Sequence, residues 1–139
     1  MIAETTLTEL RRAYPALHAL DPASLARIRA EARTLSVVAG ERAFDVGSPC
    51  ADFLLVLEGS LSVIRPAPGG REIQLYRVRP GENCVLTLIC LLERADYPAR
   101  GTVESDLHAV ALPGSLLREL LDVERLPVEA DHLVRRPTL

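Results

Sequence analysis

The chain has 139 residues, of which 48% are hydrophobic, and this is enough for one compact domain with a core of its own. It contains no apolar run of about 18 residues and no secretion signal, and its three cysteines do not suggest a disulfide framework, so we expect a cytoplasmic protein with free thiols. A formal net charge of −3 argues against a broad nucleic-acid surface, and the chain alone should bind DNA poorly.

Two helices are predicted at the N-terminus. Thr6 followed by Glu9 has the spacing of a capping box, and apolar residues then recur at helical intervals until a proline interrupts them. A second helix is predicted after Asp21, because this side chain can cap a helix and Pro22 suits its first position. An apolar stripe predicts that this helix continues to about Arg33.

The pattern then changes to that of β-strands, with short apolar segments separated by glycine, proline or charged turns. The predicted strands are residues 35–38, 43–46, 53–57, 61–64, 71–78, 101–104 and 107–112. The two glycines within residues 66–70 can take positive φ, which predicts a β-hairpin there. Many short antiparallel strands at this spacing are typical of a sandwich or barrel closed by Greek-key links.

Between Pro80 and Val103 the strands are interrupted by a glycine turn, a short apolar run that can form a helix, and a polar loop. A helix start beside such a loop offers free backbone amides, and Arg100 can supply a fork of matching charge, so we expect a small anion such as a phosphate to bind here. The candidate ligand-binding residues are Arg100, Thr87, Thr102, Gly101, Cys84 and Glu82. Each polar one has a structural alternative: an exposed arginine, threonines bonded to local backbone, and an exposed turn glutamate.

A C-terminal helix is predicted from the leucine stripe of residues 116–121, with Ser115 as its possible cap. Two prolines and a polar composition follow, and no sustained heptad is present. We therefore expect the domain to occupy residues 1–122 and residues 123–139 to form a loose tail without a helix-turn-helix.

The cysteine and histidine patterns do not favour a metal site or a catalytic site. Cys84 and Cys90 would lie about 240° apart around a helix, Cys50 belongs to a distant turn, and an iron-sulfur cluster needs a fourth thiolate. The His-x-His pair of a cupin and a Gly-x-Ser-x-Gly motif are both absent from the sequence. We expect no metal and no enzyme. Cys84 is either a reactive thiol near a helix start or a buried, inert one.

Several segments together resemble the cyclic nucleotide-binding domain of Crp/Fnr-type transcription regulators, over about residues 7–121. They are Val-Val-Ala-Gly-Glu from residue 37, Phe-Leu-Leu-Val-Leu-Glu-Gly-Ser-Leu-Ser-Val from residue 53, the Pro-Gly-Glu turn from residue 80, and Leu-Leu-Arg-Glu-Leu-Leu from residue 116. The resemblance implies a mainly β fold, an antiparallel jelly roll (double-stranded β-helix) with two N-terminal helices, a short inserted helix and a C-terminal helix. It also implies a link to a dimerisation helix and a winged helix-turn-helix, and hence a possible homodimer.

The family's phosphate-binding cassette implies a glutamate for the ribose hydroxyl and an arginine for the cyclic phosphate. Matching the cassette's Leu-Leu end to residues 91–92 places Thr87-Leu88 at its Gly-Glu positions, and counting from the glycine turn places Val85-Leu86 there. Neither match supplies a carboxylate. Ala99 takes the arginine position, with Arg100 one residue later, and in a strand a shift of one residue turns a side chain to the other face.

Three functions of different classes remain open. The first is a ligand-sensing domain of a Crp/Fnr-like regulator, which binds a cyclic nucleotide or another small phosphate-bearing effector and meets DNA only through a helix-turn-helix absent from these residues. The second is a stand-alone jelly-roll module for protein interaction, with a degenerate, empty pocket. The third, a small cupin-like enzyme, would need barrel side chains that converge on a metal. No membrane partner is expected.

Overall fold

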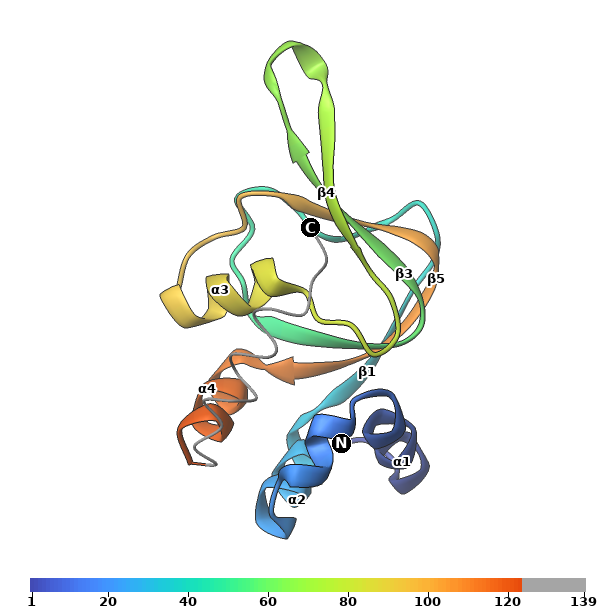
Figure 1. The fold of residues 1–139 in the computed structure, drawn as a ribbon, viewed down its shortest axis with the longest axis vertical. Coiled ribbons are helices and arrows are strands. Elements are labelled where there is room, and N and C mark those ends of the chain that lie inside the picture. The colour runs from blue at the N-terminus through green and yellow to red at the C-terminus, as the bar shows by residue number, and fades with distance from the viewer. Residues whose placement is uncertain (124–139) are drawn as a thin grey trace.

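The computed structural model describes residues 1–123 and has an antiparallel jelly-roll architecture, with strands in the order β1-β5-β3-β4 and β2 paired with β5 (Figure 1). The strands are β1 (Arg33–Val37), β2 (Arg42–Phe44), β3 (Asp52–Pro66), β4 (Glu72–Val78) and β5 (Arg100–Pro113). The helices are α1 (Glu4–Ala13), α2 (Pro22–Glu31), α3 (Val85–Glu93) and α4 (Gly114–Val123), with short 3₁₀ turns η1 (Pro15–Ala19) and η2 (Pro68–Gly70). This order of elements confirms the predicted fold class.

β3 and β5 each join two segments that the sequence predicts as separate strands. β3 and β5 pair with each other on both sides of these junctions, and register shifts lie between Val56 and Leu61 of β3. Gly59 takes a φ of 83° there, and a Cβ at this position would lie 2.2 Å from the backbone oxygen of Asp106. Such bulges bend a strand without ending its ladder, so the predicted turns at Glu58-Gly59 and Ser105-Asp106 are wrong.

The structure confirms the predicted N-terminal cap of α2 but not that of α1. The predicted capping box is wrong: α1 begins after Ala3 without a side-chain cap, and both Thr6 and Glu9 lie inside the helix. The cap of α2 is confirmed, because the amide of Ser24 donates to Oδ1 of Asp21 at 2.8 Å. α2 ends at Glu31, slightly before the predicted end. The 3₁₀ turn η1 lies between these helices and was not predicted.

α4 begins at Gly114, two residues earlier than predicted, so Ser115 lies in its first turn and not before it. The amide of Gly114 donates to the backbone oxygen of Ala51 at 2.8 Å, and a Cβ on Gly114 would lie 2.6 Å from Cδ2 of Leu91 in α3. The glycine therefore allows α4 to start in close contact with α3. Residues 124–139, nearly all of the predicted tail, lie outside the described residues.

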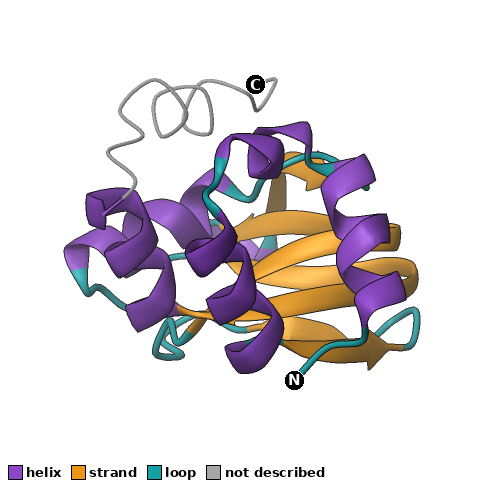
Figure 2. Ribbon diagram, turned by 90° about the horizontal axis from the view of Figure 1, so that it is seen from below, coloured by secondary structure: helices purple, strands orange, loops and turns teal. Residues whose placement is uncertain are grey.

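The core has two layers. One lies between the helices and the strands, and Figure 2 shows the helices gathered over one side of the strands. Its largest buried members include Leu10, Ile28, Phe53, Leu112 and Leu116. The other layer fills the inside of the roll and includes Phe44, Val63, Tyr97, Val103 and Leu107. Within residues 1–123, no helix has the length and apolar character that a membrane crossing requires.

Candidate functional site

α3 and its flanking loops form the insertion in which the sequence places a ligand. The preceding turn is held against the N-terminal helices, because the hydroxyl of Tyr14 donates to the backbone oxygen of Glu82 at 2.7 Å. Gly81 has a φ of 82°, and a Cβ there would lie 2.9 Å from the backbone oxygen of Ala13. α3 ends at Glu93, and the next residue, Arg94, adopts a left-handed φ of 55°. The turn before α3 therefore lies close against the C-terminal end of α1.

Three hydroxyl groups and a thiol meet on the buried side of α3. Oγ1 of Thr87 lies 3.1 Å from Sγ of Cys84 and 3.1 Å from the hydroxyl of Tyr97. The hydroxyl of Tyr76 lies 3.5 Å from the same sulfur and accepts a hydrogen bond from the amide of Leu86 at 2.9 Å. We call Tyr76, Cys84, Thr87 and Tyr97 the α3 hydroxyl cluster. It has no charged member, and its groups are hydrogen-bonded to one another.

Burial determines the acid-base properties of this region. It raises the pKa of Tyr97 and of Tyr76 well above the ordinary value of 10.0, so both phenols stay protonated and can act as hydrogen-bond donors.

The structure brings together two of the residues that the sequence predicts for the site, Cys84 and Thr87. Their tyrosine partners were missed as site residues, although a tyrosine in an apolar strand or loop signals a hydroxyl that needs a partner.

The other two cysteines lie beside the cluster. The sequence predicts Cys50 in a distant turn, whereas the structure brings it close to Thr87. Sγ of Cys50 lies 3.6 Å from the backbone oxygen of Thr87, and Sγ of Cys90 lies 3.7 Å from that of Asp96. Burial raises the pKa of both thiols, that of Cys90 to about 11, which disfavours the reactive thiolate. Within residues 1–123, these cysteines are free, and no group of three His, Cys, Asp or Glu side chains is arranged to hold a metal ion.

Arg100 does not face the inside of the roll, contrary to the sequence-based expectation. Its neighbours Ala99 and Gly101 are buried in the inner layer, and side chains alternate along a strand, so Arg100 points to the opposite face of β5. There it forms an ion pair with Glu72 of β4, and only 14% of its side chain is exposed. Its charge is directed away from the α3 hydroxyl cluster.

The remaining candidates have local structural contacts. Thr102 lies on the same face of β5 as Arg100 and pairs with Ser62 of β3. Gly101 leaves room for the ring of Phe44, because its Cβ would lie 2.4 Å from Cε2 of that ring. The carboxylate of Glu82 accepts a hydrogen bond from the amide of Arg79 at 2.8 Å and closes the turn before α3. These three residues are not brought together with Thr87 and Cys84.

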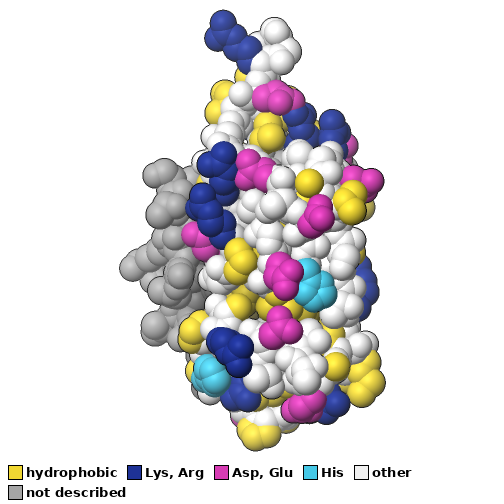
Figure 3. Space-filling view, turned by 90° about the vertical axis from the view of Figure 1, so that its right-hand side faces the viewer, with side chains coloured by type: hydrophobic (Ala, Val, Ile, Leu, Met, Phe, Trp, Pro, Cys, Tyr) yellow, Lys and Arg dark blue, Asp and Glu magenta, His cyan; other side chains and the backbone are white. Residues whose placement is uncertain are grey.

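The positions where the family cassette has its glutamate are apolar or hydroxyl-bearing here. Leu88 is fully buried, Thr87 belongs to the α3 hydroxyl cluster, and Val85 and Leu86 are half-buried. Neither possible match of the sequence therefore brings a carboxylate to the start of α3. Acidic and basic side chains are intermixed on the face shown in Figure 3, and pairs such as Arg77 with Glu104 balance the charge locally.

Comparisons with known proteins agree with the fold described above. A family model described as the cyclic nucleotide-binding domain matches residues 34–124. The N-terminal domain of a transcriptional regulator from Streptomyces coelicolor A3(2) is similar at 29% identity, with a TM-score of 0.67 over 92% of this chain and 87% of that one. Comparison with curated protein sequences gave no match.

Two further solved structures share the fold at lower identity. DNR from Pseudomonas aeruginosa is 18% identical, with a TM-score of 0.79 over 98% of this chain and 60% of that one. The regulatory domain of Toxoplasma gondii PKA, crystallised with cAMP, is 19% identical, with a TM-score of 0.75 over 86% of this chain and 46% of that one. The chain thus spans 60% or less of the length of these two proteins.

Proposed function

Because the chain belongs to the cyclic nucleotide-binding domain family, we propose that it is the effector-sensing domain of a Crp/Fnr-like transcription regulator. The similarity to the N-terminal domain of the Streptomyces coelicolor regulator, at 29% identity over most of both chains, carries this proposal. The role is one of binding and not of catalysis. DNA would be reached through another part of the regulator, and pairing of two subunits is part of the same proposal.

The effector that fits this site best is uncharged and carries several hydroxyl or carbonyl groups. A cyclic phosphate bears a negative charge, and a charged group needs a paired partner when it leaves water. The α3 hydroxyl cluster offers only neutral groups, while Arg100 is paired with Glu72 on the other face of β5. Hydroxyl groups of a ligand could instead exchange hydrogen bonds with Thr87 and Tyr97.

An effector at α3 has a direct route to α4. Nη1 of Arg118 in α4 donates to the backbone oxygen of Leu91 in α3 at 3.0 Å, and the two helices are in close contact at Gly114. A ligand that binds one arrangement of α3 better than another would therefore shift the position of α4. α4 is the last described element, so its position bears directly on whatever follows it in the chain.

The test compares cAMP with adenosine, which has the same base and ribose without the charged phosphate. Isothermal calorimetry and thermal unfolding are measured with cAMP, cGMP, adenosine and inorganic phosphate, and with a panel of uncharged polyols and nucleosides. We expect hits among the uncharged compounds, weakened by Thr87→Val, and no gain in affinity of cAMP over adenosine. Arg100→Ala should leave these results unchanged. Saturable cAMP binding that needs Arg100 would instead favour a phosphate-bearing effector.

A second candidate function is a protein-interaction module whose interior holds no ligand. The observation that favours it is the α3 hydroxyl cluster itself, because its hydroxyl and thiol groups already satisfy one another. On this hypothesis no compound of the panel raises the melting temperature. The gene offers a further test: a basic helix-turn-helix encoded in the same polypeptide would favour the sensor, because a regulator needs a DNA reader.

A further inference from the structure

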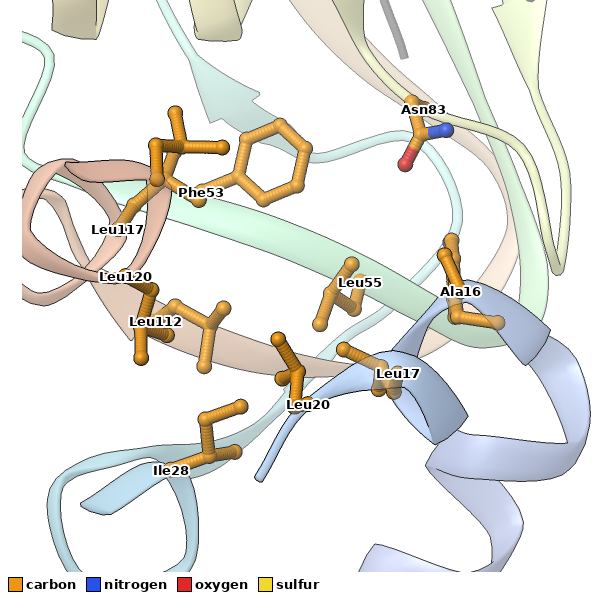
Figure 4. A pocket seen from close by; sticks show the side chains of 12 residues that line it. Ala16, Leu17, Leu20, Ile28, Phe53, Leu55, Asn83, Leu112, Leu117 and Leu120 are labelled. Atoms are coloured by element: carbon orange, nitrogen blue, oxygen red, sulfur yellow. The ribbon is translucent and has the colours of Figure 1, made fainter. Parts of the chain in front are cut away.

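A separate cavity lies between the N-terminal helices, the strands and α4, away from the α3 hydroxyl cluster. It has a volume of about 80 Å³ (Figure 4). Its walls are almost entirely leucine, isoleucine and phenylalanine side chains, including Leu20, Ile28, Phe53 and Leu120. The cavity thus touches η1, α2, β3, β5 and α4, and joins elements that are far apart in the sequence.

One polar side chain in this wall has no partner. Asn83 is only 4% exposed, and its Oδ1 atom accepts no hydrogen bond. Figure 4 shows this oxygen on the side of Asn83 that faces the apolar residues of the cavity. A buried acceptor without a donor destabilises the folded state, so a native structure that retains one calls for an explanation.

A bound water molecule does not explain Asn83 well. Buried waters typically make about three hydrogen bonds to protein groups. The other polar group in the wall, the hydroxyl of Tyr14, already donates to the backbone oxygen of Glu82 and accepts from the amide of Val56 at 2.8 Å. Water at Oδ1 would therefore have too few partners among the surrounding leucines.

We propose that this cavity is a binding site for a small apolar molecule that carries one hydrogen-bond donor, such as a short-chain alcohol. The apolar part would fill the cavity and the donor would meet Oδ1 of Asn83. An engineered cavity of about 150 Å³ binds benzene, so the smaller volume here suits a chain of about four carbons. This site differs in place and in ligand chemistry from the one at the α3 hydroxyl cluster.

The position of Asn83 gives such a ligand a route to the rest of the domain. Asn83 directly precedes Cys84, the N-terminal cap of α3, while the opposite walls belong to α2 and α4. Occupancy would therefore tie the start of α3 to α4 and to the N-terminal helices. A molecule in this cavity would stabilise one relative arrangement of these elements over others.

The test uses n-butanol and n-butyl chloride, which have similar length and differ in the donor. Binding is followed by NMR titration of isotope-labelled protein, with the side-chain amide of Asn83 and the methyl groups of Ile28 and Leu120 as reporters. We expect saturable shifts at these groups and an affinity for n-butanol about three- to tenfold higher than for n-butyl chloride, as one hydrogen bond would give. Asn83→Leu should abolish this preference and raise the melting temperature.

Ala16 and Ala19 provide a matched pair of variants, because both lie in η1 and only Ala16 lines the cavity. Ala16→Leu should weaken binding of both compounds at least tenfold, whereas Ala19→Leu, at an exposed position, should leave it unchanged. Equal affinity for the two compounds, shifts confined to other parts of the protein, or no saturable shift in the unmodified protein would each overturn the proposal. The location and the saturation of the shifts are both measured on the unmodified protein, so these two outcomes do not depend on whether a variant folds.

Discussion

Gly101 leaves room for an aromatic stack inside the roll. It lies under the ring of Phe44, which stacks on Tyr97 with ring centroids 3.9 Å apart. We expect Gly101→Ala to destabilise the protein by about 1–3 kcal/mol, because the added methyl group overlaps this ring. Urea unfolding would measure the loss. The same substitution in a Phe44→Leu background should cost less, and an equal cost in both backgrounds would show that the ring is not the cause.

Cys90 gives a pH-dependent prediction. Burial, and then the nearby Cys50 and Cys84, raise the pKa of Cys90 from 9.0 to about 11. In the unfolded chain this thiol loses its proton near pH 9, while the folded state keeps it, so its contribution to stability is complete below pH 9 and is lost as the pH rises towards 11.

The free energy of unfolding should therefore fall more steeply between pH 9 and pH 11 in the unmodified protein than in Cys90→Ala. Urea titrations at several pH values in this range would measure both slopes. Tyr97, whose pKa is also raised by burial, contributes equally to the two proteins and cancels in the comparison. Parallel curves would contradict the assignment of the raised pKa to Cys90.

At the scale of helices and strands, local signals account for most of the fold. The Asp21 cap acts on its own helix within three residues, and the structure confirms it. By contrast, Glu58-Gly59 reads as a turn because glycine favours turns, yet β3 continues through it as a bulge. Whether a glycine ends a strand or bends it depends on the strand paired alongside, here β5, and no local pattern contains that information.

α4 provides a test of packing at this scale. Leu116 is 1% exposed and lies in the core layer between the helices and the strands. We expect Leu116→Ala to lower the free energy of unfolding by about 2–5 kcal/mol, because it leaves a cavity in this layer. Ser115 is exposed on the same turn, and Ser115→Ala should change stability by less than about 0.5 kcal/mol. Similar values for the two variants in denaturant unfolding would refute the packing of α4.

For the molecule as a whole, the sequence indicated the segment around α3, but not how its side chains are arranged in space. Thr87 and Cys84 are close in sequence to the helix start that indicated them, and they do lie together. Tyr76 belongs to another strand, and its contact with Cys84 depends on how β4 packs against α3. The orientation of Arg100 depends on strand register, in which one residue decides between the inner and outer face.

Tyr14 connects three parts of the molecule through one hydroxyl. It lies just after α1, donates to the backbone oxygen of Glu82 before α3, and accepts from the amide of Val56 in β3 at 2.8 Å. Tyr14→Phe keeps the ring and removes both hydrogen bonds, and we expect a loss of about 1–3 kcal/mol because the Val56 amide stays buried without this acceptor.

Tyr14→Phe should also reduce protection from hydrogen exchange near the lost hydrogen bonds more than elsewhere in the protein. Hydrogen exchange, measured by mass spectrometry under native conditions, should accelerate in residues 80–88 and in β3 more than in the protected centre of β5, because the hydroxyl holds the first two together. Thr8→Ala is the matched control, since its hydroxyl bonds only to Glu4 of its own helix. Uniform acceleration in Tyr14→Phe would mean that the N-terminal helices and the start of α3 are not coupled through Tyr14, and that a ligand at either end could not use this connection.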